Sequence, residues 1–109
     1  MALAVEDLSR SIGFWTAIGM REVGRGDHVA VLEMRGGTHL VLFPGRPAST
    51  ADAPFDLMVE DLDATHSVWK AQGLTVEPIV RGEIHDTFVV VDPDGYRIQV
   101  NDTHVVGPV

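Results

Sequence analysis

The sequence predicts an α+β fold built from two tandem copies of one βαβββ module. When the chain is shifted by 54 residues against itself, Leu3–Leu8 falls on Leu57–Leu62, and eight of the first 20 positions are identical. The two tryptophans of the chain, Trp15 and Trp69, superpose. In each copy a short apolar strand and a helix of about 3.6-residue periodicity precede three strand-like runs.

Each copy opens with a strand that leads into a capped helix. The strands are expected at Leu3–Val5 and Phe55–Val59, followed by Asp7 and Asp61, whose carboxylates can accept from free N–H groups of the first helical turn. Apolar residues at helical spacing in the first copy are Leu8, Ile12, Trp15 and Ile18. Glycines suited to a left-handed helix end follow at Gly19 and Gly73.

Three further strands are expected after each helix. They are Met20–Val23, His28–Met34 and Thr38–Phe43 in the first copy, and Leu74–Val80, Asp86–Val91 and Tyr96–Asn101 in the second. Turns are expected at Gly24-Arg25-Gly26, Gly36-Gly37 and Asp92-Pro93-Asp94-Gly95. The proline-containing segment 44–54 is typical of a linker, so we expect one domain, 1–109, made of module one (1–43), the linker and module two (55–105).

Composition excludes several functional classes. The net charge of −8, with only 8 basic residues, argues against binding to nucleic acid or to an anionic membrane surface. Without cysteine, the chain has no disulfide framework, thiol nucleophile or thiolate metal site. We find no apolar run near the roughly 20 residues of a membrane span and no secretory signal, so a cytoplasmic location is expected.

Three motifs resemble one known family. These are the two Val-Glu-Asp-Leu helix starts at 5–8 and 59–62, Phe14-Trp15, and the run from Asp92 to Val100 that begins Asp-Pro-Asp-Gly. Together they make the chain resemble the vicinal oxygen chelate superfamily, which includes glyoxalases, bleomycin resistance proteins and extradiol dioxygenases. The resemblance implies a curved eight-stranded mixed sheet that forms a cup around a ligand, with one helix per module outside.

Strand alternation predicts which side chains line this cup. Residues assigned to it by alternation are His39, Val41, Phe43, Asp56, Met58, Arg97, Gln99 and Asn101. Residues assigned to it by the resemblance are His85, Thr87 and Val89. Such a mixture of apolar walls and a few polar groups is typical of a small-molecule pocket. Arg97 opposite Asp56 can form an ion pair or hold a ligand carboxylate. The alternative to a ligand cup is that these polar side chains form a strand face that meets water or a dimer partner.

The metal site of the family is expected to be absent. The resemblance places metal ligands at Val41, at Gln99, at Pro54 and just before Met1, and of the three residues present only Gln99 has a ligating side chain. A stable divalent site needs three or more converging N or O ligands. A metal is therefore expected only if the natural chain begins upstream and supplies a further ligand.

A metal-independent binding protein is the favoured function, with an aromatic metabolite or an antibiotic as the expected ligand. The alternatives are a metal-dependent enzyme resembling glyoxalases or dioxygenases and a non-catalytic dimerisation module. No catalytic residue is assigned, and a homodimer is expected from the resemblance. Fold membership alone does not decide among these functions.

Overall fold

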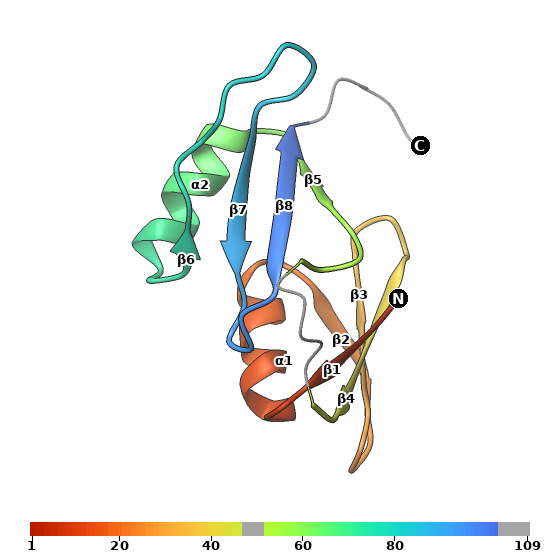
Figure 1. Cartoon of the computed structure of the whole chain (residues 1–109). Helices are drawn as coiled ribbons and strands as arrows, with labels where there is room; N and C mark the ends of the chain where they lie inside the picture. The colour runs from red at the N-terminus through yellow and green to blue at the C-terminus, as the bar shows by residue number, and fades with distance from the viewer. Residues whose placement is uncertain (47–51, 103–109) are drawn as a thin grey trace. The chain divides into compact units, whose positions relative to one another are not determined.

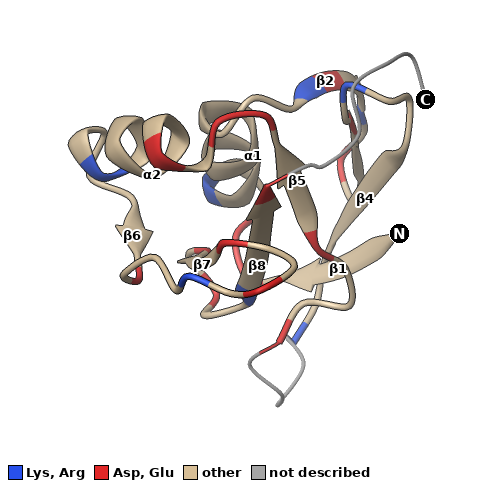
Figure 2. Ribbon diagram, turned by 90° about the horizontal axis from the view of Figure 1, so that it is seen from above, with Lys and Arg blue, Asp and Glu red and all other residues tan. Residues whose placement is uncertain are grey.

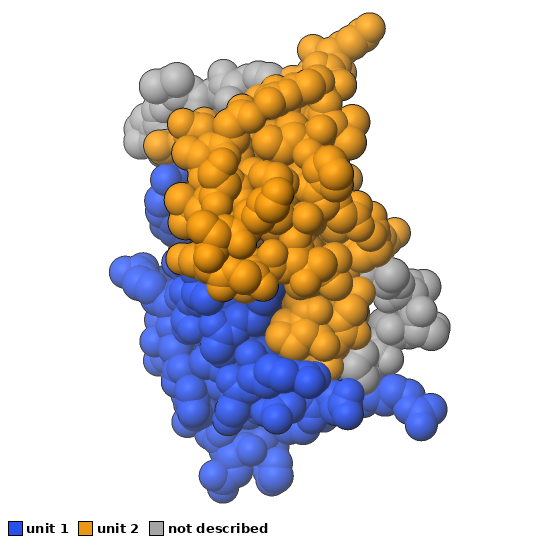
Figure 3. Space-filling model, turned by 90° about the vertical axis from the view of Figure 1, so that its left-hand side faces the viewer, with its two compact units in different colours: residues 1–50 blue, residues 51–109 orange. Residues whose placement is uncertain are grey.

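The computed structural model describes residues 1–46 and 52–102, and it contains the two βαβββ modules (Figure 1). The chain divides into two compact units, Met1–Thr50 and Ala51–Val109 (Figure 3). The middle of the predicted linker, 47–51, and the end of the chain, 103–109, lie outside the described residues. Neither helix in the described ranges is long and apolar enough to cross a membrane.

The first unit is a four-stranded sheet with a helix on one face. Its elements are β1 (Ala2–Val5), α1 (Leu8–Ala17), β2 (Arg21–Arg25), β3 (Ala30–Glu33) and β4 (His39–Pro44). The strand order is β1-β4-β3-β2, and only β1 and β4 run parallel. Helix α1 packs on β3 and β4, where Leu32, Leu40 and Leu42 are fully buried, as is Trp15 of the helix.

The second unit repeats this arrangement. Its elements are β5 (Leu57–Val59), α2 (Leu62–Ala71), β6 (Thr75–Val76), β7 (Thr87–Val91) and β8 (Arg97–Asp102). The strand order is β5-β8-β7-β6, with β5 parallel to β8 (Figure 1). The core lies between α2 and the sheet, where Trp69 meets the buried Phe88 edge to face at 5.7 Å. The repeated tryptophans thus fill equivalent places in the two units.

Both helices begin and end at the predicted residues. Asp7 accepts a hydrogen bond from the Arg10 backbone N–H at 3.0 Å, and Asp61 accepts one from Ala64 at 2.9 Å. Gly19 and Gly73 follow the helices with φ of 117° and 86°, in the left-handed region that glycine occupies at no steric cost.

The strand expected at Leu74–Val80 is much shorter in the structure. Only Thr75–Val76 forms β6, although the Glu77 N–H still donates to the Val89 carbonyl at 2.8 Å. Pro78 has no N–H to continue the ladder, and pairing resumes only at an isolated bridge between Val80 and Thr87.

The turn expected at Gly24-Arg25-Gly26 is also wrong. Strand β2 continues to Arg25, and the register shifts between Glu22 and Gly24, so this glycine marks a β-bulge. The chain turns between β2 and β3, at residues 26–29, where Gly26 N–H donates to the Val29 carbonyl at 2.7 Å. Strand β3 accordingly begins at Ala30 and not at His28.

His66 joins α2 to the segment that follows β6. Its Nε2 lies 2.8 Å from the Glu77 carbonyl oxygen, and its ring meets Phe88 edge to face at 4.9 Å. Because a carbonyl only accepts, Nε2 carries the hydrogen. The half-buried ring therefore fixes the backbone of Glu77 against the helix.

Asp92 is a buried carboxylate in the turn between β7 and β8. Its Oδ1 accepts from the N–H groups of Asp94 at 2.9 Å and Tyr96 at 2.8 Å. Its Oδ2 has no hydrogen-bond partner among the residues that the structure describes. Burial raises the pKa of Asp92, and the two backbone hydrogen bonds only partly oppose this shift. The ionised carboxylate is thus less favourable in the folded chain than in the unfolded one.

Replacement of Asp92 by asparagine is expected to change how stability depends on pH. A raised folded-state pKa means that the contribution of this group is complete at low pH and is lost as the pH rises through that pKa. Asp92→Asn keeps an oxygen for both N–H donors but has no charge, so its stability relative to the wild type should increase with pH and then level off. Denaturant titrations of both chains between about pH 3 and pH 7 measure this difference. Asp92→Ala also loses the acceptor and should be less stable than Asp92→Asn throughout, and a difference independent of pH would contradict the account.

Loss of the His66 hydrogen bond is expected to lower stability by about 1 kcal/mol. His66→Leu leaves the Glu77 carbonyl without this donor, whereas the amide of His66→Gln can reach it. Chemical denaturation should therefore show the Leu variant to be the less stable one, with Gln recovering part of the loss. Equal stability of the two variants would show that the ring acts by packing alone.

Candidate functional site

The face of the second sheet away from α2, called here the far face, carries the polar residues of β8. Tyr96, Ile98 and Val100 are buried on the helix side. Arg97 and Gln99 alternate with them and therefore lie on the far face. On β7 the same alternation buries Phe88 and Val90, which leaves Val89 beside Gln99, its register partner.

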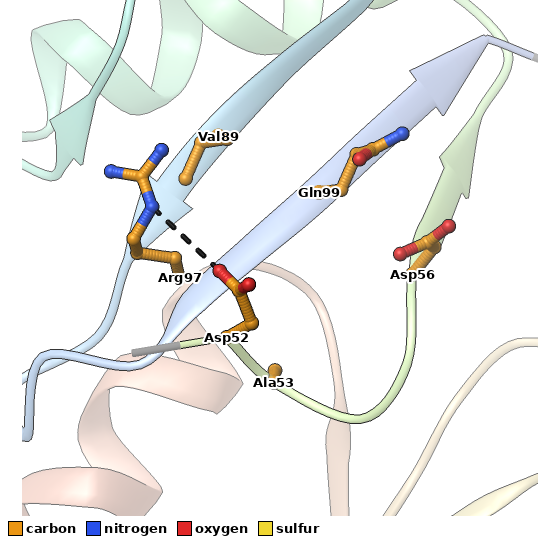
Figure 4. A pocket seen from close by; sticks show the side chains of 6 residues that line it. All are labelled: Asp52, Ala53, Asp56, Val89, Arg97 and Gln99. Atoms are coloured by element: carbon orange, nitrogen blue, oxygen red, sulfur yellow. Dashed lines mark ion pairs between the residues drawn. The ribbon is translucent and has the colours of Figure 1, made fainter. Parts of the chain in front are cut away.

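A hollow of about 270 Å³ opens on the far face. It is lined by Asp52, Ala53, Asp56, Val89, Arg97 and Gln99 (Figure 4). The backbone before β5 forms one side of it, since the Ala53 N–H donates to the Arg97 carbonyl at 2.9 Å. The side chains offer one apolar surface, one amide, one guanidinium and two carboxylates.

Arg97 is held by a residue outside the lining, Glu77. The two terminal nitrogens of the guanidinium donate one to each carboxylate oxygen, with 2.9 Å between Nη2 and Oε1. Asp52 lies farther away, with its Oδ1 3.9 Å from Nε of Arg97 (Figure 4). The Arg97 guanidinium holds the pKa of Glu77 below its ordinary value, mainly through these hydrogen bonds. Of the two roles considered for Arg97, the ion pair is formed with Glu77, and with Asp52 at a longer distance, and not with Asp56.

Four of the expected residues of the second module lie outside this hollow. Met58 is exposed, and Thr87 donates its hydroxyl to the Val100 carbonyl at 2.9 Å. Asn101 is buried and accepts from the Gln99 amide at 3.0 Å. His85 lies with Nδ1 3.2 Å from the carbonyl oxygen of Asp102. These contacts hold the strand and its neighbouring loop together.

Three expected residues belong to the first unit. His39, Val41 and Phe43 alternate along β4 with the buried Leu40 and Leu42. Nε2 of His39 lies 3.3 Å from Oε1 of Glu33, which also pairs with Arg21 at 2.6 Å. The face of β4 away from α1 therefore has a polar end at His39 and an apolar end at Phe43.

Sequence reasoning missed Asp52, Ala53 and Glu77. The first two fall in the segment taken as a linker, where strand alternation gives no orientation. Glu77 lies in the strand expected at Leu74–Val80. Because side chains two residues apart lie on the same face of a strand, its spacing from Thr75 could have placed both on the polar far face. The proline at 78 shows why that strand ends there.

Carboxylates outnumber positive charges at the hollow, with Asp52 and Asp56 in its lining and Glu77 bound to Arg97. Figure 2 shows acidic residues at both ends of β5, where Asp56 precedes the strand and Glu60 and Asp61 follow it. Within residues 1–46 and 52–102, no three His, Asp or Glu side chains gather closely enough to hold a metal ion. The site offers hydrogen bonds and charge to a ligand.

Solved structures share the fold over nearly the whole chain. TnmS3, an antibiotic-binding protein from Streptomyces sp. CB03234, is 23% identical with a TM-score of 0.80, covering 94% of this chain and 91% of its own. Lactoylglutathione lyase from Agrobacterium tumefaciens is 21% identical with a TM-score of 0.77, covering 94% and 90%. A bleomycin resistance determinant encoded on the transposon Tn5 is 19% identical with a TM-score of 0.73, covering 95% of each chain.

No curated protein sequence matches the chain. The profile of the Glyoxalase/Bleomycin resistance protein/Dioxygenase superfamily matches residues 1–100. This match takes in both modules, with both Val-Glu-Asp-Leu helix starts and the Asp-Pro-Asp-Gly turn. The chain belongs to the glyoxalase/bleomycin resistance protein/dioxygenase superfamily.

Proposed function

We propose that this protein binds a small organic molecule in the hollow on the far face of the second sheet. The observation that carries the proposal is the convergence of Val89 with the polar groups of Arg97, Gln99 and Asp56 on one cavity of about 270 Å³. A largely preformed pocket with one apolar surface and a few directed polar groups is how proteins orient small ligands. A volume of this size suits one small molecule or one part of a larger one.

The similar proteins support binding without deciding the ligand. One of them is described as an antibiotic-binding protein and another as a bleomycin resistance determinant. An antibiotic or an aromatic metabolite is the ligand class that we propose for this chain. Since the lining of the hollow has no aromatic ring, recognition there depends on the Gln99 amide and the charged groups.

We further propose that binding needs no divalent metal. Two of the positions that the metal-using members fill are Val41 and Pro54, whose side chains have no donor atom. Gln99 can offer only its amide oxygen, because its amide nitrogen donates to Asn101. The residues present do not fit a site that requires three or more N or O ligands. We also propose that the protein is a cytoplasmic homodimer. Sedimentation velocity measures the oligomeric state.

Shortening Val89 is expected to weaken ligand binding about tenfold. Val89→Ala removes two methyl groups from the wall of the hollow, worth roughly 1.5 kcal/mol when a ligand covers them. A screen of aromatic metabolites and antibiotics by native mass spectrometry identifies the ligand, and amide chemical shifts of Val89 and Gln99 report its place. Val91→Ala is the matched control, because Val91 lies on the same strand and face but not in the lining. Absence of any saturable ligand, or equal losses in the two variants, would refute the proposal.

Removal of metal ions is expected to leave binding unchanged. Tag-free protein dialysed against a chelator should bind the same ligand with the same dissociation constant as untreated protein. Elemental analysis of the untreated sample is the companion measurement. One equivalent of a divalent metal per chain, together with loss of binding on chelation, would favour a metal-dependent enzyme instead.

A further inference from the structure

The backbone of Glu77 is fixed from two sides. Its N–H donates to the Val89 carbonyl at 2.8 Å, and its carbonyl accepts from His66 at the same distance. The following residue, Pro78, has a fixed φ, which restricts the chain further. The Glu77 side chain therefore starts from a defined point next to the lining residue Val89.

From this point Glu77 reaches diagonally across β7 to Arg97. In the ladder Val89 pairs with Gln99, and Val91 pairs with Arg97. The carboxylate meets the guanidinium through both of its oxygens, and the two side chains are 39% and 38% exposed. The paired arrangement fixes the orientation of both groups. Each terminal nitrogen of the guanidinium that lines the hollow thus already donates one hydrogen bond to Glu77.

Few positive charges are left to attract an anion to the hollow. Arg97 is the only lysine or arginine in the lining, which also carries the carboxylates of Asp52 and Asp56. With Glu77 on Arg97, the hollow and its border carry three carboxylates and one guanidinium. A ligand carboxylate that enters must displace Glu77 or meet like charges at short range, and both cost free energy.

We infer that Glu77 determines the charge specificity of the hollow: by holding Arg97 it excludes anionic ligands and admits neutral or cationic ones. This inference rests on the proposed function of the same hollow. Glu77 does not line the hollow, and it affects a ligand there through its hold on Arg97.

Three probes of the same shape and different charge test the inference. Benzoate, benzamide and benzamidinium are titrated into ¹⁵N-labelled protein, and the signals of the Arg97 Nε and the Gln99 side-chain amide are followed. In the wild type the neutral and cationic probes should bind more tightly than benzoate. Glu77→Gln keeps the backbone contacts and frees the guanidinium, so benzoate should bind about fivefold more tightly and benzamidinium more weakly.

A matched control removes the same charge elsewhere. Glu22 also holds an arginine through two hydrogen bonds, to Arg25 Nε at 2.9 Å and Nη2 at 2.8 Å, and it lies on β2 of the first unit. Glu22→Gln changes the net charge equally and should leave the probe preference unchanged. Equal effects of the two substitutions, or tight binding of benzoate to the wild type, would overturn the inference.

Failure of the proposed function gives a different result. If none of the three probes shifts the Val89 and Gln99 signals in any variant, the hollow does not bind such molecules. The inference is then judged with acetate, which needs only an accessible guanidinium. Acetate should shift the Arg97 Nε signal at a lower concentration in Glu77→Gln than in the wild type or Glu22→Gln, and equal responses would overturn it.

Discussion

Packing of α2 against one face of the second sheet decides where the polar side chains of the hollow can lie. Burial of Ile98 and Val100 under the helix forces the alternate residues of β8, Arg97 and Gln99, onto the far face. A shift of one residue in register would exchange these faces and bury a guanidinium in the core. The apolar contacts of α2 therefore specify the site, although no residue of the helix lines it.

The two copies of the module use the same alternation for different surfaces. On β4 the residues away from α1 are His39, Val41 and Phe43, so this face ends in apolar side chains. On β8 the equivalent face carries a guanidinium and an amide. The helix sides are alike because both must bury leucine, isoleucine or valine against a tryptophan-bearing helix. Duplication thus preserves the core pattern and leaves the other face of each sheet to diverge in chemistry.

The sequence predicts most accurately those elements in which one hydrophobic period runs through the whole helix or strand. The repeat, the caps at Asp7 and Asp61 and the alternation of β8 follow from local rules, and the structure contains them. Sequence reasoning failed where one residue interrupts a period, as the proline after Glu77 does in the strand expected at Leu74–Val80. It also failed to give the partner of Arg97, because a long side chain can reach diagonally across a neighbouring strand. Sequence spacing does not encode that choice among several nearby carboxylates.

The Arg97–Glu77 pair sets the placement of charge at the hollow and contributes little to how firmly the chain folds. Both side chains are more than a third exposed, and ion pairs in that setting contribute little to stability because water and salt screen them. The core beneath, with Phe88 and Ile98 almost fully buried, supplies far more. A weak pair at the mouth of a cavity still fixes the position of its charges. Charge placement can therefore change at this hollow at little cost to the fold, which separates the charge of the hollow from the stability of its scaffold.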